Sequence, residues 1–406
     1  MSKEKRRVPK LRFPGFTEDW EQRKLGEVVT INPKTELPDE FKYVDLESVV
    51  GTNLLGFQVI KKENAPSRAQ RLASYGDVFY QTVRPYQRNN YLFENVDKDM
   101  VFSTGYAQLR SKLDSYFLLT LVQNDNFVKV VLDNCTGTSY PAINGSELGK
   151  ITVQIPSNEV EANQIGKVFR GIDKSITLHQ RKLDNLKLKK KALLQKLFPK
   201  NGERYPELRF PGFTDAWEQR KLGDLLILLK DGSHGTHKNT DAGVYLLSAK
   251  NIKNGRINIM PDDRIISWDD YNVIHKNYEL QIGDILLTIV GSIGETAIFN
   301  LKTKVTFQRS VAFLRPNSNL NNGFLYTLIN TDRFQNQLQT KQVVSAQPGI
   351  YLGDLATIDI TYPKNILEQE KIYNIFREIE NSITLHQRKL DHLQLQKKAL
   401  LQQMFV

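Results

Sequence analysis

Several features that mark particular classes of protein are scarce in this chain. Its 406 residues include a single cysteine, Cys135, so an intramolecular disulfide is impossible and a zinc cluster lacks ligands. No run of about 18 apolar residues is present, so no membrane-spanning helix is expected. The first residues lack the apolar core and the cleavage site of a secretory signal. These absences favour a protein of the reducing cytoplasm.

Motifs for catalysis are missing as well. Gly145–Lys150 is one residue short of a phosphate-binding loop. Asn32-Pro33 lacks the second proline and the aromatic residue of an adenine methyltransferase signature. No well-spaced acidic element of the nuclease type is evident, and no further metal ligands accompany His234 and His237. We therefore expect no catalytic residue and no metal site in this chain.

Positive charge, in contrast, is abundant. Lys and Arg number 56 against 45 Asp and Glu, which gives a formal net charge of +11. Such an excess favours a polyanionic partner such as nucleic acid. A length of 406 residues also exceeds what one ordinary core needs, so two or more domains are expected.

The chain contains an internal duplication. Residues Leu11–Gly26 recur as Leu208–Gly223 with 14 of 16 positions identical. Ser175–Phe198 recurs as Ser382–Phe405 with 19 of 24 positions identical. Close repeats of this kind indicate two copies of one structural unit. The chain therefore runs as a block, a variable region and a helix, twice over.

Each repeated helical segment, extended upstream, carries an apolar stripe with 4-3 spacing, which is typical of a coiled-coil seam. Two matching seams in one chain can satisfy each other. The stripes also hold Lys190 and Lys397, and two histidines that we expect to set register rather than to act in catalysis. The seam positions are Ile176, His179, Leu183, Leu186 and Leu193 in the first copy and Ile383, His386, Leu390, Leu393 and Leu400 in the second.

The variable regions, roughly 27–155 and 224–362, predict mixed β-rich domains. Short apolar runs such as Asp77–Thr82 and Asp284–Ile289 each begin in a Gly-Asp turn and indicate strands. The two turns are 207 residues apart, as are other markers, so the regions share a framework while most residues between the markers differ. This pattern is that of one fold reading two different ligands. Drift after duplication is the alternative that the sequence leaves open.

Polar side chains that can contact nucleic acid follow the first predicted strand and lie in further loops of both regions. Arg pairs with guanine at base edges in the major groove, and Asn or Gln pairs with adenine. In the first region the candidates are Thr82, Arg84, Tyr86, Gln87, Arg88, Asn89 and Asn90, with Ser103, Thr104 and Tyr106 from a second loop. In the second region they are Ser233, His234, His237, Lys238, Lys250, Asn251, Gln308, Arg309 and Ser310. As groups, these residues predict two surfaces that contact DNA.

The repeated LRFPGF block, the HQRKLD helix and the alternation of variable and repeated segments resemble the DNA specificity subunit of a type I restriction-modification system. The phrases DGSHGTH, GDILLTIVGSIG and TFQRSVAFLRP in the second variable region also resemble that family's recognition domains. In the first region GDVFYQTVRP and STGYAQLR match more loosely. The resemblance covers essentially the whole chain.

The resemblance implies an α+β chain in which two target recognition domains are separated by two long helices packed as an antiparallel coiled coil, with a pseudo-twofold internal repeat. The corresponding divisions are 1–155 for the N-terminal segment and first recognition domain, 156–200 for the central helix, 201–362 for the linker and second recognition domain, and 363–406 for the distal helix.

The resemblance further implies a non-catalytic subunit that binds double-stranded DNA, two modification subunits and restriction subunits. No cofactor is expected in this chain, because S-adenosylmethionine, ATP and Mg²⁺ are expected on the partner subunits. Two helices of roughly 35–40 residues would span about 50–60 Å, and successive major grooves on one face of B-DNA lie about 34 Å apart. The expected target is therefore bipartite and asymmetric, with its spacing set by the helices.

Two other functions are compatible with parts of the sequence. The chain could be the recognition half of a fused restriction-methylation enzyme, although the repeats leave no room for a catalytic domain. It could also be a coiled-coil protein adaptor, which accounts for the helices but leaves two large, basic, β-rich domains without a role.

Overall fold

The computed structural model describes residues 7–95, 99–343 and 348–406. Contacts divide the chain into two compact units. The first unit is Met1–Arg181 with Gln387–Val406, and the second is Lys182–His386. Each unit thus combines one variable region with part of each repeated helix, whereas the division made on the sequence treats the helices as separate segments.

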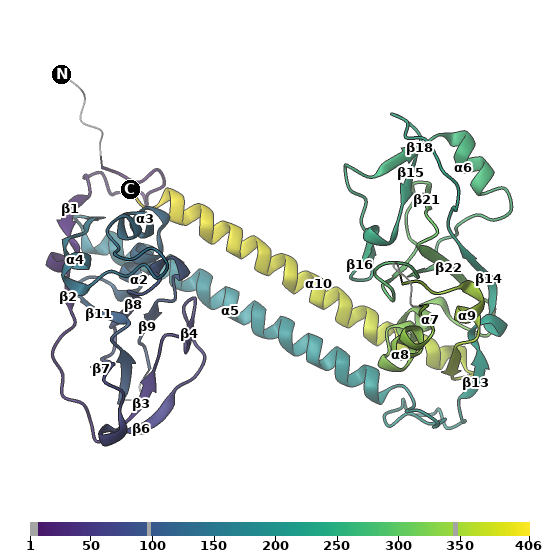
Figure 1. The fold of residues 1–406 in the computed structure, drawn as a ribbon, viewed down its shortest axis with the longest axis horizontal. Helices are drawn as coiled ribbons and strands as arrows, with labels where there is room; N and C mark the ends of the chain where they lie inside the picture. The colour runs from purple at the N-terminus through teal and green to yellow at the C-terminus, as the bar shows by residue number, and fades with distance from the viewer. Residues whose placement is uncertain (1–6, 96–98, 344–347) are drawn as a thin grey trace. The chain divides into compact units, whose positions relative to one another are not determined.

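The first unit contains a β-rich region followed by short helices (Figure 1). Its strands are β1 (Glu21–Lys24), β2 (Val29–Ile31), β3 (Glu40–Val44), β4 (Val49–Val50), β5 (Asn53–Leu54), β6 (Gln58–Lys61), β7 (Ala69–Leu72), β8 (Val78–Gln81), β9 (Tyr91–Leu92), β10 (Met100–Ser103), β11 (Tyr106–Ser111) and β12 (Thr152–Ile155). Its short helices are α1 (Leu25–Val28), α2 (Ser115–Gln123), α3 (Asp125–Asp133) and α4 (Gly145–Lys150), with 3-10 turns η1 (Lys62–Asn64) and η2 (Pro85–Gln87).

The second unit has a similar order of elements, except that within its described residues it lacks a strand equivalent to β7 and contains the additional helix α6. Its strands are β13 (Glu218–Lys221), β14 (Leu226–Asp231), β15 (Val244–Leu247), β16 (Ile252–Lys253), β17 (Arg256–Ile257), β18 (Arg264–Ile266), β19 (Ile285–Thr288), β20 (Thr296–Ile298), β21 (Val305–Phe307), β22 (Val311–Pro316) and β23 (Asp359–Tyr362). Its short helices are α6 (Trp268–Ile274), α7 (Asn322–Ile329), α8 (Asp332–Thr340) and α9 (Leu352–Ala356), with 3-10 turns η3 (Leu222–Leu225) and η4 (Ala249–Asn251).

Sheet topology confirms that the two variable regions share one framework. β1 pairs antiparallel with β12, as β13 does with β23. A four-stranded sheet of order β2-β11-β8-β9 is matched by one of order β14-β22-β19-β20. A second sheet of order β6-β3-β10-β7 is matched by β18-β15-β21, and each contains one parallel pair. The strands predicted at Asp77–Thr82 and Asp284–Ile289 are β8 and β19.

The same ion pair fixes the start of these two equivalent strands. Asp77 is fully buried, and both of its carboxylate oxygens accept hydrogen bonds from Arg110 on β11, at 2.8 and 2.9 Å. In the second unit Arg315 on β22 donates twice to Asp284, at 2.7 Å each. A bidentate pair of this kind holds both partners in one geometry. The duplication therefore kept this buried ion pair in both units.

The two repeated segments form long helices that begin and end close to their predicted limits. α5 runs over Glu159–Lys196 and α10 over Ile366–Gln403, 38 residues each. Every predicted seam position, including both histidines, is buried or half-buried. Other leucines on the same helices are more than half exposed, namely Leu178, Leu188, Leu385 and Leu395. The prediction of one buried stripe on each helix is confirmed.

In the first unit, the end of α10 completes the core of the recognition region. Phe405 packs against Trp20, Phe117 and Phe169, with ring centroids 6.1, 5.7 and 6.0 Å away. The backbone N–H of Leu11 donates to the carbonyl of Gln403 at 2.9 Å. Because Phe169 lies on α5, both helices and the repeated block meet in one apolar cluster.

In the second unit, the end of α5 has the equivalent role. Phe198 packs against Trp217, Phe324 and Phe376, with centroids 5.9, 5.6 and 6.3 Å away. The N–H of Leu208 donates to the carbonyl of Lys196 at 2.8 Å. Each helix therefore starts against one recognition region and ends in the core of the other.

The two lysines in the stripes each pair with an acid on the opposite helix. Lys397 Nζ lies 2.7 Å from Asp173 Oδ1 in the first unit, and Lys190 Nζ lies 2.8 Å from Glu380 Oε1 in the second. Together with the phenylalanine contacts, these pairs show that α5 and α10 run in opposite directions within each unit. Supercoiling of the two helices stays a prediction. No helix in the described ranges is long and apolar enough to cross a membrane.

Candidate nucleic-acid interface

Three segments of the second unit that lie far apart in the sequence meet beside the turn between β21 and β22. Ser233 forms a parallel bridge with Gln308, and the N–H of Arg309 donates to the carbonyl of Ser233 at 3.0 Å. The backbone N–H of Ala249, the first residue of η4, donates to Ser310 Oγ at 3.0 Å. The structure therefore gathers all three predicted groups of the second region into one cluster.

Side-chain contacts hold the loop after β14 in shape. His237 Nε2 lies 2.6 Å from Ser233 Oγ. Its Nδ1 lies 3.1 Å from Asp270 Oδ1, near enough for an electrostatic contact but without hydrogen-bond geometry. His234 Nε2 lies 2.6 Å from Asp231 Oδ2. These contacts position the loop, and they leave the ring of His234 largely exposed.

Basic side chains of this cluster differ in whether an acid holds them. Lys238 and Arg309 are exposed and pair with no acid in the part of the chain that the structure describes. Lys250 Nζ instead lies 2.9 Å from Asp263 Oδ1. A cation without an acidic partner can neutralise a phosphate or reach a base edge without first breaking an ion pair within the protein. Lys238 and Arg309 are therefore the stronger candidates for contact with DNA.

Asn251 is fully buried and organises the turn from beneath. Its Nδ2 donates to Asp263 Oδ2 at 2.6 Å, and its Oδ1 accepts from the N–H of Ser248 at 2.9 Å. Burial acts to raise the pKa of Asp263. Hydrogen bonds from the N–H of Met260, from Lys250 and from Asn251 outweigh burial and leave that pKa below its usual range. The buried carboxylate thus anchors the turn that carries Lys250.

In the first unit, the predicted groups meet at the turn between β10 and β11. The N–H and the hydroxyl of Thr82 both donate to the carbonyl of Gly105, at 2.9 and 2.8 Å. Ser103 Oγ accepts from the N–H of Gly105 at 3.3 Å. A segment that the sequence did not indicate joins them, because the N–H of Ile143 donates to the carbonyl of Thr82 at 3.0 Å.

The run that follows β8 turns back on the domain through η2. Arg84 and Arg88 flank this turn and both have a φ of +56°, a conformation that non-glycine residues rarely adopt. The guanidinium of Arg84 lies 4.4 Å from the ring centroid of Tyr140. Arg88 pairs with Asp125 at 2.6 Å. Tyr86 is half exposed between them, so Arg84 and Tyr86 remain the members of this run best placed for a ligand.

The remaining polar residues of the run bind the protein itself. Asn90 Oδ1 accepts from the N–H of Gln81 at 2.8 Å, and Asn89 Oδ1 accepts from the N–H of Gly51 at 2.9 Å. Gln87 Oε1 accepts from the side chain of Gln81 at 2.8 Å. These bonds stabilise the loop, and contact of the same residues with DNA stays a prediction.

Burial separates the candidates further. Thr82, Asn90, Ser103, Tyr106 and Asn251 are all buried, and burial raises the pKa of the Tyr106 phenol. Buried side chains shape a surface more than they touch a large partner. The structure therefore brings the predicted residues together as groups, but several of them are too buried to be strong candidates for contact with DNA.

A polar cavity of about 370 Å³ opens beside the β10–β11 turn of the first unit. Three predicted residues line it, Thr82, Thr104 and Tyr106. Asn32, Arg71 and Asn144 line it as well, and the sequence did not indicate them. Arg71 lies on β7 in a short strand without any motif, so only its position in space reveals it.

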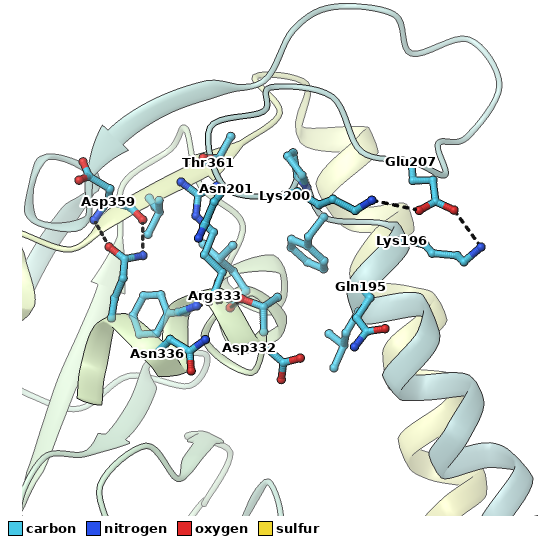
Figure 2. Close-up of a pocket in the computed structure, with 18 residues that line it drawn as sticks. Gln195, Lys196, Lys200, Asn201, Glu207, Asp332, Arg333, Asn336, Asp359 and Thr361 are labelled. Atoms are coloured by element: carbon cyan, nitrogen blue, oxygen red, sulfur yellow. Dashed lines mark hydrogen bonds and ion pairs between the residues drawn. The ribbon is translucent and has the colours of Figure 1, made fainter. Parts of the chain in front are cut away.

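A larger cavity of about 490 Å³ lies in the second unit between the end of α5, the linker after it, α8 and β23 (Figure 2). On the linker side Glu207 pairs with Lys196 and Lys200, at 2.9 and 3.8 Å. Burial lowers the pKa of Arg333 on α8. None of the predicted nucleic-acid contacts lines this cavity, so it is separate from the candidate interface.

Residues 7–95, 99–343 and 348–406 contain no group of three or more His, Cys, Asp or Glu side chains arranged to hold a metal ion. The polar clusters described above offer hydrogen-bond donors and cations, which suit contact with an anionic polymer.

A protein-family model described as the type I restriction modification DNA specificity domain matches residues 17–188 and again residues 214–395. Each match spans one variable region and most of the long helix that follows it. The match therefore repeats with the internal duplication.

Individual relatives agree with the family model. The type I restriction enzyme MjaVIII specificity subunit of Methanocaldococcus jannaschii is 23% identical over 304 residues, which cover 71% of this chain and 68% of that protein. The putative MjaX specificity subunit of the same organism is 21% identical over 414 residues, covering 95% and 92%. The crystal structure of a type I restriction-modification S subunit from M. genitalium, 14% identical, aligns over 98% of this chain and 99% of that one with a TM-score of 0.63. The last comparison shows a shared fold.

Proposed function

This chain belongs to the type I restriction-modification DNA specificity family, and we propose that its two variable regions read the two halves of a bipartite, asymmetric DNA target. A specificity subunit is the non-catalytic member of such a system, and the catalytic activities sit on partner subunits.

The main support for this proposal is that the two regions share a framework, while the segments beside two equivalent strands differ. β10 and β21 occupy the same place in the matched sheets. In the first unit β7 lies along β10, whereas in the second the N–H of Ser233 donates to the carbonyl of Phe307 on β21 at 2.8 Å. Base edges are read by side chains held at fixed positions. A common scaffold with different side chains at one edge supports the reading of two different half-sites.

We also propose that exposed leucines on the helices bind two modification subunits. The first unit presents Leu178 and Leu395, and the second presents Leu188 and Leu385, with 51–68% of each residue exposed. The duplication relates Leu178 to Leu385 and Leu188 to Leu395. Apolar side chains kept exposed at related positions favour two copies of one partner. Restriction subunits would join the same complex.

Replacing Leu188 and Leu395 by Glu tests this docking surface. We expect fewer modification subunits to copurify with the variant, because a charge replaces apolar surface on both helices. The matched control is Lys187→Gln with Lys189→Gln, which copies Gln394 and Gln396 of the second helix and should leave assembly unchanged. Full assembly of the leucine variant would contradict the proposed surface.

Cofactor binding follows from this division of labour. We propose that S-adenosylmethionine, ATP and Mg²⁺ bind the partner subunits and that the assembled system works in the cytoplasm. The carboxylates of the candidate interface pair with basic side chains, as Asp263 does with Lys250. Titrating each ligand into the chain alone should give no binding signal, and into the assembled complex a clear one.

We propose further that α5 and α10 set the number of unread base pairs between the half-sites. Adding four residues to each helix, after Arg181 and after Arg388, lengthens it by about 6 Å. The unread spacer should then widen by one or two base pairs, since neighbouring pairs lie about 3.4 Å apart. An unchanged spacer would remove this role for the helices.

Methylation assays test the function as a whole. The purified chain should methylate nothing with S-adenosylmethionine, and addition of its modification subunits should produce methylation within a defined motif. We expect that motif to contain two short, different half-sites and a fixed unread gap. Methylation by the chain alone, or a continuous motif from the complex, would contradict the proposal.

A further inference from the structure

Arg71, like Arg333 on α8, differs from four other arginines that lie in polar, partly buried places. Arg12, Arg110, Arg209 and Arg315 each contact a buried carboxylate at 2.6–2.8 Å. Arg71 pairs with no acid among the described residues, and its Nε is buried without a hydrogen bond there. Burial lowers the pKa of its guanidinium. A buried N–H donor that has lost water without gaining an acceptor is costly unless a ligand supplies one.

The cavity around Arg71 is already formed by bonds within the protein. Thr82 Oγ1 donates to the carbonyl of Gly105 at 2.8 Å. Asn32 Oδ1 accepts from the N–H of Gln108 at 3.0 Å, and Asn144 Oδ1 accepts from the N–H of Glu147 at 2.9 Å. These walls are fixed by local structure, and Nε of Arg71 is the one buried side-chain donor of this lining that has no hydrogen-bond partner among the described residues.

The position of Arg71 in the sheet supports a role in reading DNA. It lies on the edge strand β7, opposite Phe102 of β10 and beside a break in the strand register. In the second unit the matching side of β21 is bordered by the loop that holds Ser233 and His237. Arg71 therefore occupies the place where the two otherwise equivalent regions carry different chemistry.

We propose that Arg71 determines specificity at one base pair of the first half-site by contacting a guanine through its guanidinium. This inference rests on the proposed function of the chain. Two parallel N–H donors match O6 and N7 of guanine in the major groove. A lysine offers a point charge without that planar fork. The same position could not be recognised from the sequence, because AQRL around Arg71 matches no motif.

The test uses the complete complex with its modification subunits and a panel of duplexes in which each base pair of the methylated motif is changed in turn. Arg71→Lys should reduce discrimination at a single G·C pair of the first half-site about 10- to 100-fold. Discrimination throughout the second half-site should be unchanged. The control is Arg23→Lys, at an exposed arginine on β1 that pairs with Glu21 and should preserve the whole motif.

Arg71→Met separates base reading from the alternatives, since it keeps much of the packing but removes the charge. If Arg71 contacts a phosphate instead, Arg71→Met should weaken binding equally on every duplex and lower the salt dependence of binding by about one ion. Arg71→Lys should then discriminate between bases normally. That result would overturn the proposal, as would lost folding of the first unit in both variants. If the wild-type complex has no bipartite motif, the proposed function fails before Arg71 is tested.

Discussion

At the scale of single residues, the same buried ion pair appears in both units and joins the repeated block to its long helix. Arg12 donates to both oxygens of Glu161 at 2.6 and 2.8 Å, and Arg209 donates to both oxygens of Glu368 at 2.8 and 2.9 Å. Both glutamates are almost completely buried. Because a buried carboxylate needs its partner, these arginines explain why the block was kept with the helix.

Arg209→Met should lower the free energy of unfolding of the second unit by about 3–5 kcal/mol, since it leaves a buried charge unpaired. Adding Glu368→Leu should restore much of the loss. Urea unfolding followed by tryptophan fluorescence measures both variants. Arg220→Met, at an exposed arginine near Glu218, is the control and should change stability by at most about 1 kcal/mol. Equal effects of the two arginine variants would contradict this account of the pair.

We expect His275 to make the stability of the second unit depend on pH. Its ring lies 4.3 and 4.7 Å from the rings of Tyr271 and Tyr278, and burial lowers its pKa below the ordinary value. The unfolded chain then binds a proton more readily than the folded one. The contribution of His275 to stability should therefore be fully present well above about pH 6.5 and should be lost as the pH falls through about 6.5 and below. Thermal melts of His275→Asn should lose part of this dependence. An identical pH slope in the variant would exclude the histidine as its source.

Sequence reasoning succeeded for residues that belong to long patterns and failed for isolated ones. The polar residues after Gln81 were found because they follow an apolar strand. Arg71 was missed because its proposed role depends on a cavity whose lining comes from six segments of the chain. The burial of Tyr106 was not predicted, because the sequence around it resembles a loop and a tyrosine in a loop is a candidate contact for DNA.

At the scale of elements, the ends of the two long helices are part of the domain cores. The stripe of 4-3 spacing predicted the helices to within a few residues, because the pattern extends over many turns. The role of the final phenylalanines could not be predicted, since it depends on which domain each helix end meets. The short strand β7 also escaped prediction, because four residues are too few for periodicity to specify.

Phe405→Ala should destabilise the first unit by about 3–5 kcal/mol, because it opens a cavity among buried aromatic rings. The second unit should melt as in the wild type. Leu395→Ala on the same helix is the control, since this residue is 68% exposed and should change stability by at most about 0.5 kcal/mol. Calorimetry with two resolved transitions gives both values. A shift of the second transition alone would contradict the assignment of Phe405 to the first core.

At the scale of the whole molecule, duplication explains both what the two units share and where they differ. The paired strands, the buried Asp–Arg and Arg–Glu pairs and the aromatic clusters recur. The segments that border β10 and β21 on the side away from β3 and β15 do not recur. Identity between copies predicted the shared framework from the sequence. The differing segments lack that guide, which is why the interface was predicted as groups of residues rather than as individual contacts.

The central claim, that each variable region reads one half of the target, is tested most directly by exchanging residues 27–155 for the corresponding region of a specificity subunit that reads another sequence. The methylated motif is then determined across the genome of cells that carry the chimera and its modification subunits. We predict a new sequence in one half-site, with the other half-site and the unread gap unchanged. Alteration of both half-sites, or of neither, would contradict the claim.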